Sequence, residues 1–206
     1  MQRRAFIGGL SSLLFCSKTN AGQMFLGNTQ AGPMVRAFVT RPQLIRQECP
    51  QWCWVASASM IFASRGHPVD QKRIVTQVLG ATVCASSGPT RNITGILSRS
   101  WIDDLGNAFQ PVVSAGYDFF SSVIAIDNGF IIKEILSDRP ILYCNTHHAM
   151  VIVSVDFINT PMGPVIQSVG VLDPFPASPA YHPLTPSEMR AAHMGGEMTY
   201  LASITV

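Results

Sequence analysis

The sequence has little charge and no block of like charges. Only 13% of its 206 residues are Asp, Glu, Lys or Arg, and the formal net charge is +2. Nucleic-acid binding proteins concentrate Lys and Arg in a basic stripe, and disordered chains combine low hydrophobicity with high charge. Neither pattern fits a chain that is 47% hydrophobic with dispersed charge. We therefore expect one globular domain with a substantial core and no nucleic-acid partner.

The N-terminal region lacks an apolar stretch long enough to span a bilayer. Arg3 and Arg4 precede an uncharged stretch, residues 5–15, and a polar patch, residues 17–20. A spanning helix needs about 20 apolar residues. A short apolar stretch between charged and polar flanks is typical of an export signal with cleavage after Ala21. The paired arginines also resemble a twin-arginine signal. The alternative is an apolar N-terminus of a cytosolic protein.

These signals predict the domain organisation. We expect an export signal at residues 1–21, a linker at 22–34 that could occupy a cleft, and the folded domain at 35–206. The exported protein would be periplasmic or secreted, and its mature chain would have no membrane span.

Cysteines are also few: Cys16, Cys49, Cys53, Cys84 and Cys144. In an oxidising compartment, Cys49 and Cys84 are candidates for a disulfide that would close a loop of roughly 35 residues. Cys144 lies in an apolar run and is expected to be a buried free thiol. The sequence does not fix this pairing. An exported binding module in which Cys49, Cys53, Cys84 and a histidine hold structural zinc is an alternative, although a second closely spaced cysteine pair is missing.

Periodicity and terminator residues predict an α+β fold. Helices are expected over residues 52–65, 70–79, 93–101, 128–137 and 185–192. Strands are expected over residues 35–44, 140–144, 148–155, 163–172 and 198–206, with turns or a weak hairpin over 102–124. Helices followed by adjacent strands indicate an N-terminal helical part, with a buried central helix, packed on a C-terminal antiparallel sheet.

Cys53 lies at the expected start of the central helix, whose residues are small or apolar on nearly every side. Unpaired backbone N–H groups and the positive end of the helix dipole favour a thiolate there. A cysteine in such a position, beside a histidine, can have its pKa lowered from about 8.5 to roughly 3.5–7.5. These are the requirements of a cysteine nucleophile. The alternative is a structural cysteine that packs as a small hydrophobic residue.

The second half of the chain supplies partners for such a nucleophile. His148 opens one expected strand and Asp173 follows the end of the next. Antiparallel pairing of these strands would bring both residues to the same end of the sheet, where Asp173 could fix the imidazole tautomer. His147 is the competing base, but His148 directly precedes the apolar run. Gln47 could donate to an oxyanion together with the backbone N–H of Cys53.

This arrangement resembles the papain-like cysteine peptidases over roughly residues 40–206. The most similar branch is the bacterial one that includes plant-pathogen effector proteases and double-glycine leader peptidases. The resemblance implies Cys53 as nucleophile, His148 as base and acid, Asp173 as orienter and Gln47 as oxyanion donor. The motifs that carry it are Gln47-x5-Cys53-Trp54-Val55-Ala56, His148-Ala149-Met150-Val151-Ile152 and Val171-Leu172-Asp173-Pro174.

The sequence departs from the family pattern at two positions. Trp52 stands where a small residue often precedes the nucleophile, and Ser154 stands where the histidine strand often has glycine. Papain itself has Asn as the third member. We expect a monomeric cysteine-type hydrolase without cofactor or metal, and we favour a peptidase that acts on peptide or protein substrates. An amidase or acyltransferase acting on cell-wall peptides or glutamine side chains is the alternative within the same chemistry, and an inactive papain-like domain is another.

Overall fold

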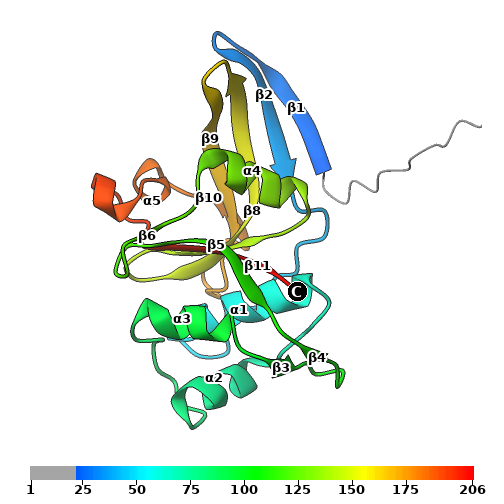
Figure 1. Ribbon diagram of the computed structural model, residues 1–206, viewed down its shortest axis with the longest axis vertical. Coiled ribbons are helices and arrows are strands. Elements are labelled where there is room, and N and C mark those ends of the chain that lie inside the picture. Colours follow the sequence, from blue (N-terminus) through cyan, green and yellow to red (C-terminus); the bar gives the residue numbers. More distant parts are fainter. Residues whose placement is uncertain (1–21) are drawn as a thin grey trace, which may run out of the picture.

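The structure is a computed structural model that describes residues 22–206 (Figure 1). The predicted export signal, including Arg3, Arg4 and Cys16, lies outside the described residues. Five α-helices, one large antiparallel sheet and a small two-stranded sheet make up the described part, a mixed architecture compatible with the predicted α+β class. No helix within it combines the length and the apolar character needed to cross a bilayer.

The large sheet has nine strands. Its main path runs in the order β1-β2-β8-β7-β11-β5-β6, while β9 pairs with β8 and β10 pairs with β9. A separate two-stranded sheet joins β3 and β4. The strands are β1 (Gly22–Thr29), β2 (Gly32–Phe38), β3 (Trp101–Ile102), β4 (Ala108–Phe109), β5 (Val112–Asp118), β6 (Val123–Ile124), β7 (Ile141–Cys144), β8 (Ala149–Thr160), β9 (Gly163–Leu172), β10 (Tyr181–Pro183) and β11 (Tyr200–Thr205).

Four of the five helices fall into two groups around this sheet, and the short α5 lies apart from both (Figure 1). In Figure 1, α1, α2 and α3 lie together at one end, and α4 lies against the arm formed by β1, β2, β8 and β9. The helices are α1 (Cys53–Ser64), α2 (Gln71–Leu79), α3 (Thr90–Ile96), α4 (Asn128–Leu136) and α5 (Pro186–Met189), and a 3-10 turn follows at Ala192–Met194.

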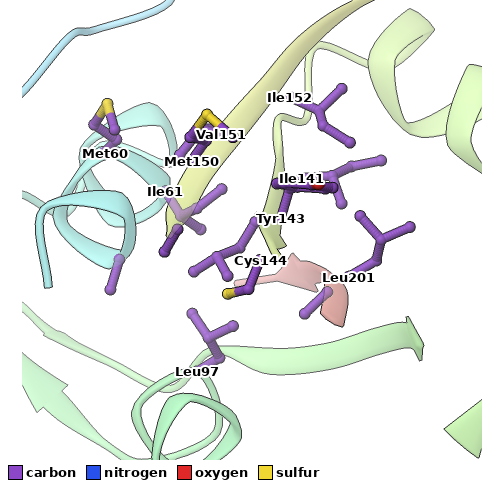
Figure 2. Close-up of a cluster of buried hydrophobic side chains, with 14 of the residues drawn as sticks. Met60, Ile61, Leu97, Ile141, Tyr143, Cys144, Met150, Val151, Ile152 and Leu201 are labelled. Carbon is purple, nitrogen blue, oxygen red and sulfur yellow. The ribbon is translucent and has the colours of Figure 1, made fainter. Parts of the chain in front are cut away.

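Helix α1 is the buried central helix that the sequence predicts. Every residue from Trp54 to Ala63 is buried, and the helix packs on β8 and β7. Met60 and Ile61 lie across from Met150 and Val151 of β8 (Figure 2). Because polar groups must be paired in such surroundings, the Ser59 hydroxyl donates to the Val69 carbonyl at 2.8 Å. The core therefore fixes both α1 and the strand that follows His148.

The helix caps predicted from the sequence are present at both ends of α2 and at the start of α5. Asp70 caps α2 by accepting a hydrogen bond from the Lys72 backbone N–H, and Gly80, with φ +80°, ends it. Thr185 and Glu188 form the capping box at the start of α5. These local interactions are sufficient to set helix ends because they need no distant partner.

The predicted linker at residues 22–34 is wrong. These residues form β1 and the first part of β2, and β2 pairs with β8 from Met34↔Ile158 to Phe38↔Ser154. The sheet consequently takes strands from both ends of the chain. These residues pair because β8 offers an open edge to β2, and β2 in turn offers one to β1.

Several other boundaries differ from expectation. The helix expected over 185–192 ends at Met189, and the segment 102–124, expected to form turns or a weak hairpin, contains β5, which pairs with β11 in the large sheet. The strand expected over residues 35–44 starts at Gly32 and ends at Phe38, and the helix expected over 93–101 is α3, which ends at Ile96. Trp101 lies in β3 instead, and its indole donates to the Ile96 carbonyl at 3.0 Å. Burial of this ring beside Phe62, with centroids 5.7 Å apart, outweighs continuation of the helix.

Candidate active site

Cys53 is the first residue of α1, where the backbone N–H groups have no helical acceptors. No side chain caps this helix start, and its first turn has no acidic residue. Cys53 is partly exposed and lines a cavity of about 870 Å³. The N-terminal end of α1 therefore presents a free thiol and unpaired amide donors to the same cavity.

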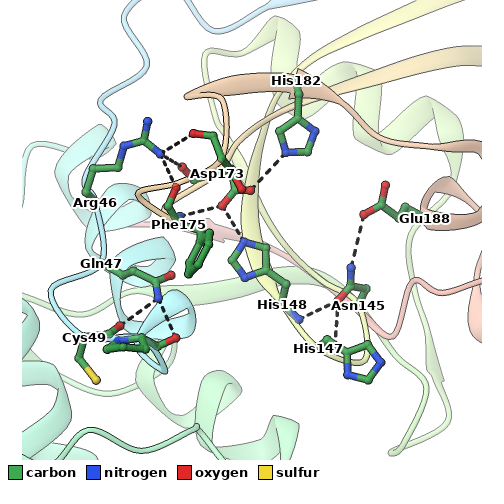
Figure 3. A network of polar contacts seen from close by, with 12 residues as sticks. Arg46, Gln47, Cys49, Asn145, His147, His148, Asp173, Phe175, His182 and Glu188 are labelled. Atoms are coloured by element: carbon green, nitrogen blue, oxygen red, sulfur yellow. Dashed lines mark hydrogen bonds and ion pairs between the residues drawn. The ribbon is translucent and has the colours of Figure 1, made fainter.

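The strands bring His148 and Asp173 together as the sequence predicts. β8 begins one residue after His148, and β9 ends one residue before Asp173. The two strands are antiparallel, with Val151 opposite Leu172. His148 Nε2 donates to Asp173 Oδ1 at 2.6 Å (Figure 3). Both residues lie at the end of the sheet that meets α1.

The electrostatics of this pair favour an imidazolium–carboxylate. Burial opposes protonation of His148, but hydrogen bonds with Asp173 and Cys53 outweigh it and raise its pKa from 6.5 to about 9. Burial likewise opposes ionisation of Asp173, yet hydrogen bonds from His148 and the Phe175 backbone N–H lower its pKa to about 2. Because Asp173 occupies Nε2, Nδ1 is the ring nitrogen left for the Cys53 thiol.

Asn145 holds the backbone that presents His148. Its Oδ1 accepts hydrogen bonds from the backbone N–H groups of His147 at 2.9 Å and His148 at 2.7 Å. The Asn145 amide also lies 3.5 Å from Glu188. The preference for His148 over His147 agrees with this geometry, since of these two histidines it is His148 whose ring contacts Asp173.

Arg46 is a residue that sequence reasoning missed. Its Nη1 donates to the carbonyl oxygens of Asp173 at 3.0 Å, Phe175 at 2.6 Å and Ser178 at 3.3 Å. The backbone N–H of Gln47 also donates to the Pro174 carbonyl at 3.0 Å. One side chain from before α1 therefore shapes the loop after Asp173. The sequence contains no signal for this role of Arg46, because every residue has a main-chain carbonyl and none can be recognised as its partner. The sequence marks only the next residue, Gln47.

Gln47 does not lie where the prediction of an oxyanion donor requires. Its Nε2 donates to the carbonyls of Cys49 at 2.9 Å and Pro50 at 2.8 Å, so both amide hydrogens are used. Gln47 is buried and is absent from the cavity lining. It supports the turn that leads into α1, and the unpaired N–H groups of α1 remain as oxyanion donors.

The loop at residues 81–89 forms one wall of the cavity. The predicted Cys49–Cys84 disulfide is present, with Cα atoms 5.9 Å apart, and it ties this loop to the approach to α1. The Trp52 indole donates to the Val83 carbonyl at 2.9 Å, and the Trp54 indole donates to the Ala85 carbonyl at 3.2 Å. Both tryptophans beside Cys53 are thus buried in the core and also hold the cavity wall.

The lining of this cavity is uncharged apart from its histidines. No Asp, Glu, Lys or Arg contributes to it among the described residues. Cys144 is a buried free thiol, as predicted, and contributes to the lining. Residues 22–34 do not line the cavity, so the expectation that they occupy it is not met. The site is open to an uncharged segment of substrate.

The zinc alternative loses its ligands in this structure. Cys49 and Cys84 are joined to each other, so neither offers a thiolate to a metal. Within residues 22–206, no group of three or more His, Cys, Asp and Glu side chains is arranged to hold a metal ion.

Comparisons with known proteins give no family for the chain. No family model matches the sequence, and no curated protein matches it.

Proposed function

We propose that the protein is an exported cysteine-type hydrolase of the papain-like kind that cleaves amide bonds in peptides or proteins. The observation that carries this proposal is the ordered contact of Cys53, His148 and Asp173 beside a cavity whose described lining has no Asp, Glu, Lys or Arg. The Cys49–Cys84 disulfide supports export, since such bridges persist in oxidising compartments.

The proposed reaction starts from a Cys53 thiolate and a His148 imidazolium. The thiolate attacks the carbonyl carbon, and the N–H groups at the start of α1 stabilise the oxyanion. His148 then gives its Nδ1 proton to the leaving amine, and a thioester remains on Cys53. Water attacks the thioester while His148 takes its proton, which releases the carboxylic acid and restores the ion pair. Asp173 keeps the ring oriented through Nε2 at both stages.

A peptidase differs from an amidase or acyltransferase in the group that leaves. Peptide cleavage creates a new N-terminus, attack on a glutamine side chain releases ammonia, and acyl transfer places the acyl group on another amine. An extended peptide is favoured because the cavity wall is formed by main chain and small residues at 86–90 and carries no charge.

Mass spectrometry of an unfolded protein substrate tests the proposal. The full chain and its Cys53→Ser variant are incubated with reduced casein, and new N-termini and released ammonia are measured. We expect new N-termini with the wild type alone. Ammonia without new N-termini would indicate an amidase, and equal products from both proteins would contradict a role for Cys53.

A further inference from the structure

The Asp173 carboxylate has two histidine partners. His148 Nε2 contacts Oδ1 at 2.6 Å, while His182 Nε2 lies 3.3 Å from Oδ2 (Figure 3). The Asp173 side chain is only 5% exposed, and those of His148 and His182 are 23% and 26% exposed. Each carboxylate oxygen therefore faces its own imidazole, and one of these rings, that of His148, lines the cavity.

His182 comes from an element that no sequence argument connects with the site. It is the middle residue of β10, opposite Val171 of β9. This pairing places it beside the end of β9, where Asp173 follows. Its other ring nitrogen, Nδ1, lies 3.1 Å from the Pro183 carbonyl. Both partners are acceptors, so the tautomer that carries its proton on Nε2 donates to Asp173, and the pairing of β10 with β9 keeps the ring at this position.

We propose that His182 is a positioning residue that keeps the Asp173 carboxylate turned toward His148. This inference rests on the triad of the proposed function. Oδ1 accepts hydrogen bonds from both His148 and the Phe175 backbone N–H, the latter at 2.8 Å. Rotation of the carboxylate about its last bond would break both contacts, and rotation about terminal sp³–sp² bonds is otherwise permissive. His182 opposes this rotation by holding Oδ2.

The nearby cation does not replace this support, while one hydroxyl adds to it. Arg46 is the nearby permanent cation, but its guanidinium contacts the main-chain carbonyl of Asp173 and not its carboxylate. The Ser178 hydroxyl contributes a hydrogen bond to the carboxylate. Among the described residues, His148 and His182 are the titratable side chains in contact with it.

Two amide substitutions separate the contacts of the two ring nitrogens. The Gln amide nitrogen in His182→Gln reaches roughly the place of Nε2 and can still donate to Asp173. The shorter amide of His182→Asn reaches the place of Nδ1, near Pro183, and not Asp173. Both variants remove the imidazole and keep a polar side chain in β10. A general loss of strand packing would affect them alike.

The readouts are alkylation of Cys53 between pH 5 and 9 and the NMR titration of His148 in the full chain. We expect His182→Asn to lower the pKa of His148 by about one unit, which reduces the imidazolium fraction at pH 8 from roughly nine-tenths to one-half and the alkylation rate about twofold. His182→Gln should leave both the His148 pKa and the alkylation rate close to those of wild type. Equal behaviour of the two variants, or a raised His148 pKa in His182→Asn, would overturn the proposal.

Two controls separate this result from other failures. His67→Gln moves the amide away from the place of Nδ1, so it removes a comparable His–Asp contact outside the site, the 2.9 Å pair of His67 Nδ1 and Asp103, and should leave Cys53 reactivity unchanged. If the proposed triad itself is wrong, His148→Ala will alkylate like wild type. If only the role of His182 is wrong, His148→Ala will be slow and His182→Asn will match wild type. The NMR titration tests the His182–Asp173 contact in either case.

Discussion

Asp173→Asn removes the charge beside His148 and keeps a side chain of nearly the same shape. The carboxylate contributes both a hydrogen bond and Coulombic attraction to the raised pKa of His148. The variant retains at most the hydrogen bond. Burial, which opposes protonation of His148, then has less to counter it. The pKa of His148 should consequently fall from about 9 toward or below its ordinary value of 6.5.

The size of this effect follows from the pKa values. An opposite charge in contact shifts a pKa by about 1–3. A fall of about 2 would reduce the imidazolium fraction at pH 8 about tenfold, from roughly nine-tenths to one-tenth. The difference between 6.5 and about 9 corresponds to at most about 3 kcal/mol in the free energy of unfolding. Part of it comes from Cys53, so we expect a loss of about 1–3 kcal/mol at pH 6.

The sign of the pH dependence is fixed by the direction of each shift. Because the folded pKa of His148 is raised, its stabilisation is complete below about pH 6.5 and is lost as the pH rises through about 9. The pKa of Asp173 is lowered, so its stabilisation is present above about pH 3.8 and is lost as the pH falls through about 2. In Asp173→Asn, the free energy of unfolding should depend less on pH both in the acid range and between about pH 6.5 and 9.

Histidine-labelled NMR titration and denaturant unfolding at pH 6 and pH 10 measure these effects. Asp103→Asn, at the other His–Asp pair, serves as the matched control and should leave the titration of His148 unchanged. An unaltered His148 pKa in Asp173→Asn would refute the assignment of Asp173 as its electrostatic partner.

Three further changes test the surroundings of the site. Gln47→Glu should lower the free energy of unfolding by about 1–3 kcal/mol, because a carboxylate would face the two carbonyls that its amide now binds; loss of activity with unchanged unfolding would instead favour an oxyanion role. Arg46→Met should slow Cys53 alkylation at pH 6 by several-fold through loosening of the loop after Asp173, and an unchanged rate would exclude that role. The double variant Cys49→Ser/Cys84→Ser opens a loop of 35 residues, so denaturant unfolding should show a loss of about 3–4 kcal/mol; a loss that reduction of the wild type does not reproduce would point to packing.

The sequence predicts best the elements whose signals are local. The caps of α2 and α5, the limits of β9 and the buried character of α1 follow from a few neighbouring residues. The meeting of His148 and Asp173 is also predictable, since an antiparallel pair joined by a short turn brings its open ends together.

Contacts between distant segments are not predictable in this way. The pairing of residues 34–38 with β8, and of β1 with β2, depends on an edge that only the folded sheet offers. Arg46 binds main-chain carbonyls, which look the same in every sequence. The Gln47 amide donates to the nearby carbonyls of Cys49 and Pro50 and not into the cavity. The spacing between Gln47 and Cys53 suggests an oxyanion donor, but it does not determine the direction of the amide hydrogens.

The most direct test of the proposed function is the rate at which iodoacetamide modifies Cys53, followed by peptide mapping between pH 5 and 9. Wild type and His148→Ala are compared without reductant, so that the Cys49–Cys84 bridge stays closed and buried Cys144 serves as the internal control. We predict rapid modification of Cys53 at pH 6 in the wild type and a strong decrease in His148→Ala. Equal rates in both proteins would contradict the thiolate–imidazolium pair and leave Cys53 as an ordinary thiol.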